Sequence, residues 1–239
     1  MTKKTALQLI ATVALAAGFI GVSGVTANAA DTDSQSTTAT VGLTAGTTDP
    51  EGPHAGAVQL IAAPDITFGS DKADGTPITG GTQTIKSPAF TTNASSTVIK
   101  STDLDQSIKD AVKNTDVAVN NPGTTDPWTV TVKADNFTKT NDIKEGETAP
   151  TLLGAVINFD GAVASGNKDT ATKAAVAAKP AVTAGGDAET ILSADSGNGV
   201  GTWMNRLSND TNLSIAAGNV AGTYSSNLTW TIANTVATN

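Results

Sequence analysis

The residue types that most often perform catalysis are scarce in this chain of 239 residues. Its only histidine, His54, lies in a stretch rich in Thr, Asp, Ser and Gly, where a solvated side chain is expected. A hydrolytic triad or a zinc site cannot be built around one such histidine. Cysteine is absent, which excludes disulfides, thiol catalysis and cysteine-ligated metals.

Carboxylates are the remaining catalytic candidates. Aspartate is plentiful, so residue counts leave hydrolysis by a pair of carboxylates open. The glutamates are Glu51, Glu145, Glu147 and Glu189. None of them has the aromatic sequence setting that raises the pKa of a carboxyl group and shapes a sugar subsite. We therefore predict that the protein is not an enzyme, with no catalytic residue and no cofactor.

Two groups of side chains offer oxygen ligands for calcium. They are Asp71 with Asp74, and Asp195 with Asn198. Neither group matches a complete calcium-binding loop, so solvated surface acids are the favoured interpretation and we predict no metal site.

A glycine-rich run at residues 195–201 comes shortly before Trp203, one of the three tryptophans of the chain. Such a run superficially resembles a phosphate loop, but it lacks the lysine, the preceding parallel strand and the following long helix. We predict a turn here, and we expect Trp203, which follows it, to be the tryptophan nearest the surface.

Each of the other two tryptophans has aliphatic residues two positions away along the chain, as expected for a strand with one buried face. One stretch, residues 222–232, places Leu228, Trp230 and Ile232 on one face. The other, residues 128–132, does the same with Trp128, Val130 and Val132. Such a Trp is usually core, because the indole buries a large area and its N–H finds an acceptor. The alternative is a partly exposed shelf on which a sugar ring or a partner's apolar side chain stacks.

These stretches carry a resemblance to a known family. Tyr224-x-x-x-Leu228-Thr229-Trp230-Thr231-Ile232 resembles the closing motif of the WxL domain, a surface domain of Gram-positive bacteria, and Trp128-Thr129-Val130 resembles its first motif. Two further motifs fit the family pattern: Gly56-x-x-x-Leu60-x-x-x-Pro64-x-x-x-Phe68-Gly69, and Leu153-Gly-Ala-x-Ile157-x-Phe159. The resemblance covers roughly residues 55–239. Val130 and Ile232 replace the family's Leu, and the proline that often follows the second motif is missing, but the aliphatic face is kept.

The resemblance implies a secreted protein that attaches non-covalently to the cell wall. It implies binding to peptidoglycan and assembly with partners, namely a membrane-anchored WxL-interacting protein and other WxL surface proteins. The predicted ligand-binding residues are those of the motifs together with the third tryptophan: Trp128, Val130, Trp203, Tyr224, Leu228, Trp230 and Ile232. Two hypotheses follow. The domain binds the glycan–peptide mesh itself, or it is a structural subunit of a surface complex that docks on a partner through a strand edge or a Trp-bearing face.

Charge narrows the choice of partner. Residues 1–29 hold two Lys and no acid, so the remainder has 14 − 2 = 12 basic and 22 acidic residues, a net charge of −10. Nucleic acid is excluded because phosphate-tracking proteins need clustered Lys and Arg. The same acidity argues against simple electrostatic docking on teichoic-acid phosphates or anionic lipid.

Three segments are expected along the chain. Residues 1–29 are predicted to be a secretory signal peptide, with Lys3 and Lys4 before an apolar run and Ala27-Asn28-Ala29 as the cleavage site. An uncleaved membrane anchor is the alternative. Residues 30–55 are predicted to be a flexible linker, and residues 56–239 the wall-binding domain. No Leu-Pro-x-Thr-Gly signal is found, so covalent sortase attachment is not expected.

The predicted fold class is all-β, an antiparallel β-sandwich in a single domain with a short accessory helix and a disordered N-terminal lead-in. The helix is expected at residues 103–114, capped by Asp103. Strands are expected at residues 57–66, 83–90, 97–100, 116–120, 128–132, 153–159, 212–215 and 223–232, and a strand or a turn at residues 189–194. Residues 162–187 are expected to be a partly extended excursion, and the two strands that bear Trp128 and Trp230 to be neighbours.

Overall fold

The structure is a computed structural model that describes residues 32–39, 58–70, 75–101, 104–121, 123, 125–166 and 175–234. All of them belong to one compact unit, Ala30–Ala237. The predicted signal peptide, His54 and the pair Asp71 and Asp74 lie outside the described residues. No described helix is long and apolar enough to cross a membrane.

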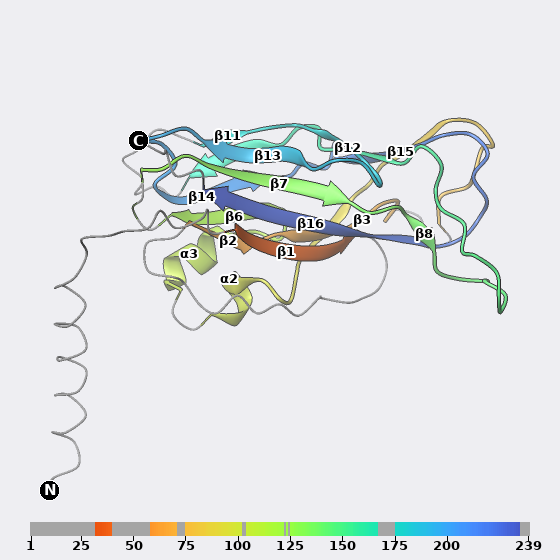
Figure 1. The fold of residues 1–239 in the computed structure, drawn as a ribbon, viewed down its shortest axis with the longest axis horizontal. Coiled ribbons are helices and arrows are strands. Elements are labelled where there is room, and N and C mark those ends of the chain that lie inside the picture. Colours follow the sequence, from red (N-terminus) through yellow and green to blue (C-terminus); the bar gives the residue numbers. More distant parts are fainter. Residues whose placement is uncertain are drawn as a thin grey trace, which may run out of the picture. The chain divides into compact units, whose positions relative to one another are not determined.

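The described strands form three sheets (Figure 1). The large sheet has the order β11 (Val176–Ala177), β13 (Glu189–Ala194), β7 (Trp128–Ala134), β16 (Tyr224–Asn234), β1 (Thr32–Ala39), β3 (Pro64–Thr67) and β5 (Ala89–Thr92), with β8 (Thr138–Lys139) paired to β16. The β14 sheet has the order β10 (Val163–Gly166), β14 (Gly201–Arg206), β6 (Asp116–Asn121) and β2 (Gln59–Ala62). The β15 sheet has the order β12 (Ala181–Thr183), β9 (Val156–Asn158), β15 (Asn212–Ile215) and β4 (Gln83–Ile85).

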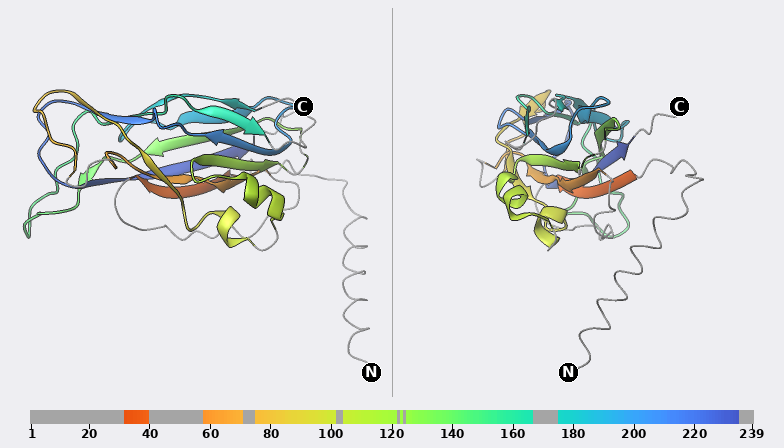
Figure 2. Two further views of the ribbon diagram at one scale, coloured as in Figure 1. Left: turned by 180° about the vertical axis from the view of Figure 1, so that it is seen from behind. Right: turned by 90° about the vertical axis from the view of Figure 1, so that its left-hand side faces the viewer.

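The sheets close around one hydrophobic core. The end-on view in Figure 2 shows the strands arranged around the centre of the domain. The core takes Trp230 from the large sheet, Val119 from the β14 sheet and Ile157 from the β15 sheet. Among the described strands, all pairings are antiparallel except the one between β1 and β3. The predicted all-β fold of antiparallel sheets is confirmed, apart from this one parallel pairing.

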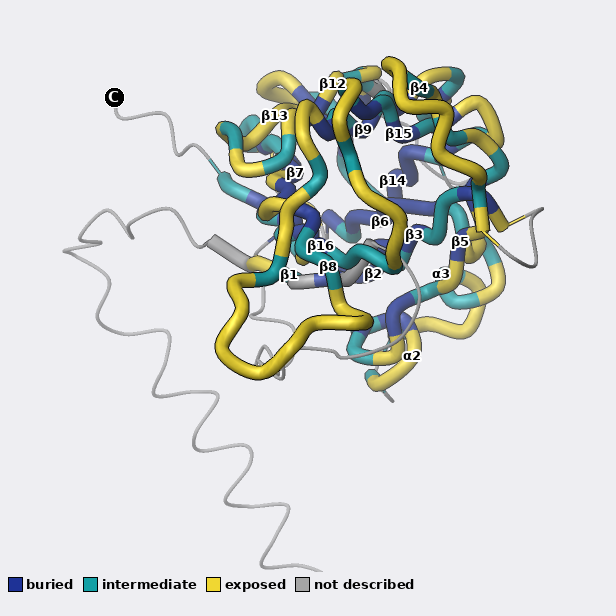
Figure 3. Tube along the Cα trace, turned by 90° about the vertical axis from the view of Figure 1, so that its right-hand side faces the viewer, coloured by how far each residue is buried: buried dark blue, intermediate teal, exposed yellow. Residues whose placement is uncertain are grey.

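The two tryptophan strands alternate as predicted. On β7, Trp128, Val130, Val132 and Ala134 are buried while the residues between them are not. On β16, Leu228, Trp230 and Ile232 are buried in the same way. The strands are antiparallel neighbours, with Trp230 opposite Val132 and Ile232 opposite Val130, so the predicted pairing is confirmed. Figure 3 shows the general distribution, with buried positions inside the domain and exposed ones mainly on the turns.

A second, smaller core lies on the other side of β2 and β6. Leu60 belongs to the main core, whereas the next residue, Ile61, packs with Ala118, Met204 and Val98. Two short helices cover this cluster, α2 (Thr97–Lys100) and α3 (Gln106–Ala111). Both faces of β2 are therefore buried.

The helical region differs from the prediction in two ways. Residues 97–100 were expected to be a strand and form α2, because burying Val98 on β2 outweighs the strand preference of Thr, Val and Ile. The predicted helix at 103–114 is shorter, and Asp105 caps α3 by accepting a hydrogen bond from the Ser107 N–H at 2.8 Å. This hydrogen bond lowers the pKa of Asp105. The expected cap, Asp103, lies outside the described residues.

Residues 32–39, expected to be part of the flexible lead-in, form strand β1 of the large sheet. That expectation is wrong for these residues because their strand character comes from pairing with β16, far away in sequence, and not from local apolar alternation. The remaining linker residues, 30–31 and 40–55, lie outside the described chain.

Three other strand predictions are refined. The region 57–66 is divided at Ala63 into β2 and β3, and Pro64 begins β3, a position at which proline is tolerated. The region 83–90 is divided at Ser87, which has a φ of 56°, into β4 and β5. In the region 153–159, β9 is an interior strand as predicted, but Leu153 lies outside it and is 52% exposed.

Candidate functional site

All three tryptophans are buried. Trp128 and Trp230 have no exposed surface and Trp203 is 6% exposed. Trp203 is the most exposed of the three, as expected, but it does not lie at the surface, because the glycine-rich run ends directly in β14 and the indole turns into the main core. Its N–H donates to the carbonyl of Val200 at 3.0 Å.

The other two indoles also have hydrogen-bond acceptors inside the domain. The Trp230 N–H donates to the Thr37 hydroxyl at 2.6 Å, and the Trp128 N–H donates to the Gly199 carbonyl at 3.3 Å. Neither ring face is available for stacking on a sugar, so the exposed-shelf alternative does not fit the structure. These indoles act as core residues with one satisfied polar atom each.

The glycine-rich run has a packing role. Gly199 has a φ of +66°, and a Cβ on it would lie 2.8 Å from Trp128 Cζ2 and 2.5 Å from the Ala194 Cβ. Its carbonyl also accepts a hydrogen bond from the side-chain amide of Asn121. Only glycine allows the turn to close over the Trp128 ring in this backbone conformation.

The remaining motif residues are also mostly internal. Val130, Leu228 and Ile232 have no exposed surface. Tyr224 is half-buried, its hydroxyl donates to the carbonyl of Val220 at 2.8 Å, and burial raises the pKa of its phenol. Ligand contact by the predicted residues stays a prediction, and the burial of all but Tyr224 argues against direct contact.

The motif core does, however, position a polar surface. The Phe159 ring meets the Trp230 ring edge-on, with centroids 6.0 Å apart and an interplanar angle of 67°. Phe159 directly follows β9, on which Ile157 is buried and Asn158 is directed away from the core. Packing against Trp230 therefore fixes the strand that presents Asn158.

Around Asn158 lies a set of hydrogen-bonding side chains, which we call the amide–carboxylate patch. Its members are Asn158, Asp160, Ser208, Asp210, Asn212 and Ser214. The Asn158 amide nitrogen donates to Asn212 Oδ1 at 2.9 Å and to Ser214 Oγ at 3.0 Å. The Asn212 amide nitrogen donates to Asp160 Oδ2 at 3.2 Å and to the Asp210 carbonyl at 2.9 Å. The patch is thus one connected network across β9, β15 and the turn before β15.

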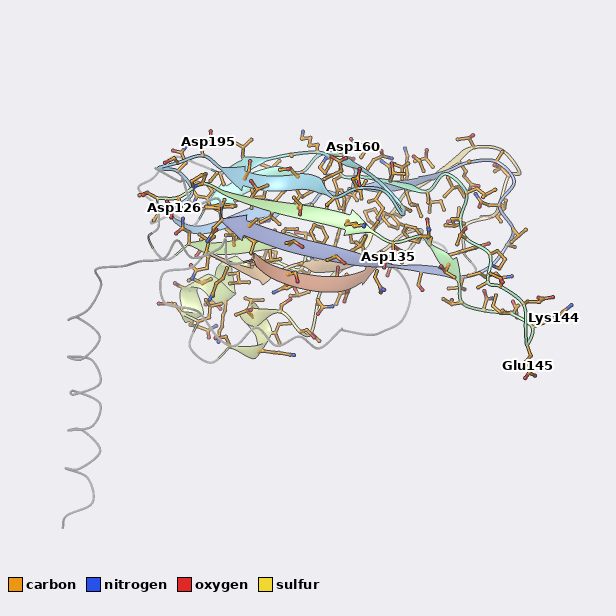
Figure 4. The ribbon with its side chains drawn as sticks, viewed as in Figure 1. Asp126, Asp135, Lys144, Glu145, Asp160 and Asp195 are labelled. Carbon is orange, nitrogen blue, oxygen red and sulfur yellow. The ribbon has the colours of Figure 1, made fainter. Side chains whose placement is uncertain are left out.

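A glycine permits this close approach. Gly161 has a φ of +72°, and a Cβ on it would lie 2.5 Å from Ser208 Oγ and 2.8 Å from Asp210 Oδ2. Asp160 and Asp210 are both exposed, and Figure 4 shows Asp160 on the outer surface of the domain. The patch offers both donors and acceptors to water or to a ligand rich in hydroxyl and amide groups.

The patch is not arranged as a metal site. Within the described part of the chain, no group of three or more His, Asp or Glu side chains is placed to hold an ion. Asp195, which the sequence offered as an oxygen ligand together with Asn198, lies exposed in a turn, where its carbonyl accepts the Asn198 N–H.

Comparison with known proteins gives the family. The family described as "WxL domain surface cell wall-binding" matches residues 30–235. The chain belongs to the WxL family. No curated protein and no solved structure gives a significant match. The matched range of this WxL domain contains every described strand, from β1 to β16, and so includes the segment that we expected to be a linker.

The family membership makes this a surface protein with a cell wall-binding domain. The motif residues were found from sequence because alternation is a local signal. The amide–carboxylate patch was missed because Asn158 and Asn212 meet only through the pairing of β9 with β15. The available signal was weak: Asn158 alternates with the apolar Ile157 and Phe159.

Proposed function

We propose that this WxL protein is secreted, is not catalytic, and attaches non-covalently to the peptidoglycan of a Gram-positive wall. The observation that carries the proposal is the amide–carboxylate patch, a solvent-facing hydrogen-bonding network held in place by the tryptophan core. Glycan strands present hydroxyl and acetamido groups, which donate and accept hydrogen bonds as the patch does. The net charge of −10 disfavours the phosphate polymers of the wall as the ligand.

Sedimentation with sacculi tests the proposal. The chain from Ala30 to Asn239 is mixed with Gram-positive sacculi stripped of proteins and teichoic acids, and the bound fraction is measured against concentration. We expect saturable co-sedimentation. If a folded protein stays in the supernatant, direct binding is wrong, and a membrane-anchored partner holding the domain becomes the better account.

A matched pair of variants locates the surface. Asn158→Ala combined with Asn212→Ala removes the centre of the patch and should abolish most of the co-sedimentation, with little change in the unfolding midpoint. Asn227→Ala removes an exposed amide from β16, in the large sheet, and should bind as the parent does. Undiminished binding by the double variant would place the contact surface elsewhere on the domain.

A further inference from the structure

β1 is unusual among the strands of the large sheet. Its sequence, Thr-Asp-Ser-Gln-Ser-Thr-Thr-Ala, contains no branched aliphatic and no aromatic residue. In the strand order of the sheet it nevertheless lies between β16 and β3. Its neighbours contribute large apolar side chains to the core, Trp230 from β16 and Ile66 from β3. An interior strand with this composition is a poor match to its surroundings.

The mismatch is located at Gln35. Gln35 is directly opposite Trp230 in the register, so its side chain lies on the core-facing side of the sheet. Its amide nitrogen donates to the carbonyl of Leu60 at 2.8 Å, but its amide oxygen is buried and accepts no hydrogen bond from any protein group that the structure describes. A buried amide oxygen that accepts no hydrogen bond from the protein is costly, which disfavours this side chain at this position.

Two kinds of contact hold β1 in place. It pairs with β16 along its whole length, from Thr32 opposite Ala233 to Ala39 opposite Ser226, but with β3 at one residue pair only, Ala39 with Ile66. Thr37 adds the acceptor for the buried N–H of Trp230. Backbone pairing is available to any extended chain, so most of what retains β1 is not specific to its sequence.

We propose that β1 is displaceable, and that the slot between β16 and β3 takes up an extended segment of a partner protein. That segment carries an apolar residue at the position of Gln35 and Ser or Thr at the position of Thr37. The apolar residue removes the unpartnered amide oxygen from beside Trp230, and the hydroxyl keeps the acceptor that the indole N–H needs. Main-chain pairing supplies the remaining contacts.

A second copy of this chain is a weaker candidate for the slot. Its N-terminal strand would bring the same glutamine and the same unpartnered oxygen. The strand already attached to the domain competes at a high effective concentration, so an identical strand from another molecule gains nothing. Displacement therefore requires a better-matching sequence.

Labelled peptides added to the intact chain from Ala30 test the proposal. The first has the sequence of residues 30–41, the second carries Gln35→Leu, and the third carries Gln35→Leu with Ser36→Pro, which disrupts strand pairing. We expect the second peptide to bind at least about tenfold more tightly than the first, and the third not to bind. Hydrogen exchange at residues 32–39 of the domain should speed up when the second peptide is bound.

The contrary results are distinct. Binding by none of the peptides, or binding without faster exchange at residues 32–39, overturns the proposal. Dimers that form without peptide and exchange their N-terminal strands would assign the slot to a second copy instead. As a converse check, Gln35→Leu in the domain itself should weaken binding of the second peptide by about tenfold, because the attached strand then fits equally well. None of these measurements involves sacculi, so their outcome is independent of peptidoglycan binding.

Discussion

At the scale of single residues, the core tryptophans depend on a few hydrogen-bond acceptors. The clearest case links β16 to β1: the Trp230 N–H donates to the Thr37 hydroxyl, and both residues are buried. The Thr37 hydroxyl also donates to the Leu228 carbonyl at 3.4 Å. The same small side chain thus serves a motif tryptophan and a strand backbone.

Removing that hydroxyl should be costly. We expect Thr37→Val, which keeps the shape of the side chain, to lower the free energy of unfolding by about 1–3 kcal/mol because a buried N–H loses its acceptor. Thr37→Ser keeps the acceptor, so its free energy of unfolding should fall clearly less than that of the valine variant. Urea unfolding followed by tryptophan fluorescence measures both variants. Equal stability of the valine variant and the parent would contradict this role for Thr37.

Tyr224 gives a pH-dependent prediction at the same scale. Burial raises the pKa of its phenol above the ordinary value of 10.0, so the folded state holds this proton more tightly than the unfolded chain does. The contribution is fully present below pH 10.0 and is lost as pH rises from there through the folded pKa. As Tyr224 is the only tyrosine, phenolate absorbance reports its titration directly.

The control for Tyr224 is its phenylalanine variant. Unfolding midpoints of the parent should fall faster with alkaline pH than those of Tyr224→Phe, since lysines titrate alike in both proteins. Parallel pH profiles, or a phenol that titrates at its ordinary pKa, would show that burial does not perturb this group.

At the scale of elements, one ion pair links β6 to β14. Arg206, the only arginine, donates from Nε and from a terminal nitrogen to the two carboxylate oxygens of Asp116, each at 2.9 Å. The Asp116 side chain has no exposed surface, whereas that of Arg206 is 42% exposed. The hydrogen bonds to Asp116 raise the pKa of Arg206.

Removing the arginine should therefore leave a buried carboxylate without its counter-charge. We expect Arg206→Met to lower the free energy of unfolding by about 3 kcal/mol, the lower end of the range for broken buried pairs, because water reaches the arginine. Arg206→Lys keeps the charge but loses the two-point hydrogen bonding, so its free energy of unfolding should lie between those of the parent and the methionine variant. Thermal and urea unfolding compare the three proteins, and a methionine variant as stable as the parent would refute the argument.

At the scale of the whole molecule, the charge of the domain makes its wall binding unlike that of a basic protein. With a net charge of −10, the chain from residue 30 gains no general attraction to an anionic wall. We expect co-sedimentation with sacculi to stay constant or to increase when salt is raised to physiological levels, because screening weakens repulsion. A steep loss of binding with salt would indicate local basic contacts that the net charge conceals.

The sequence alone determined the features that depend on local order. The two-residue spacing of Trp128 and Val130, and of Leu228 and Trp230, predicted two buried strand faces. The four short motifs in order indicated the family. These predictions succeeded because side chains two residues apart share a face of any extended strand, whatever it pairs with.

Only the tertiary structure decided which distant segments complete those strands. The strand at residues 32–39 has no apolar pattern of its own and exists through pairing with β16, and Trp203 is buried because β14 begins where its glycine-rich turn ends. The amide–carboxylate patch likewise arises from the pairing of β9 with β15. Each feature depends on contacts between residues far apart along the chain, and polar segments carry no local periodicity from which such contacts can be predicted.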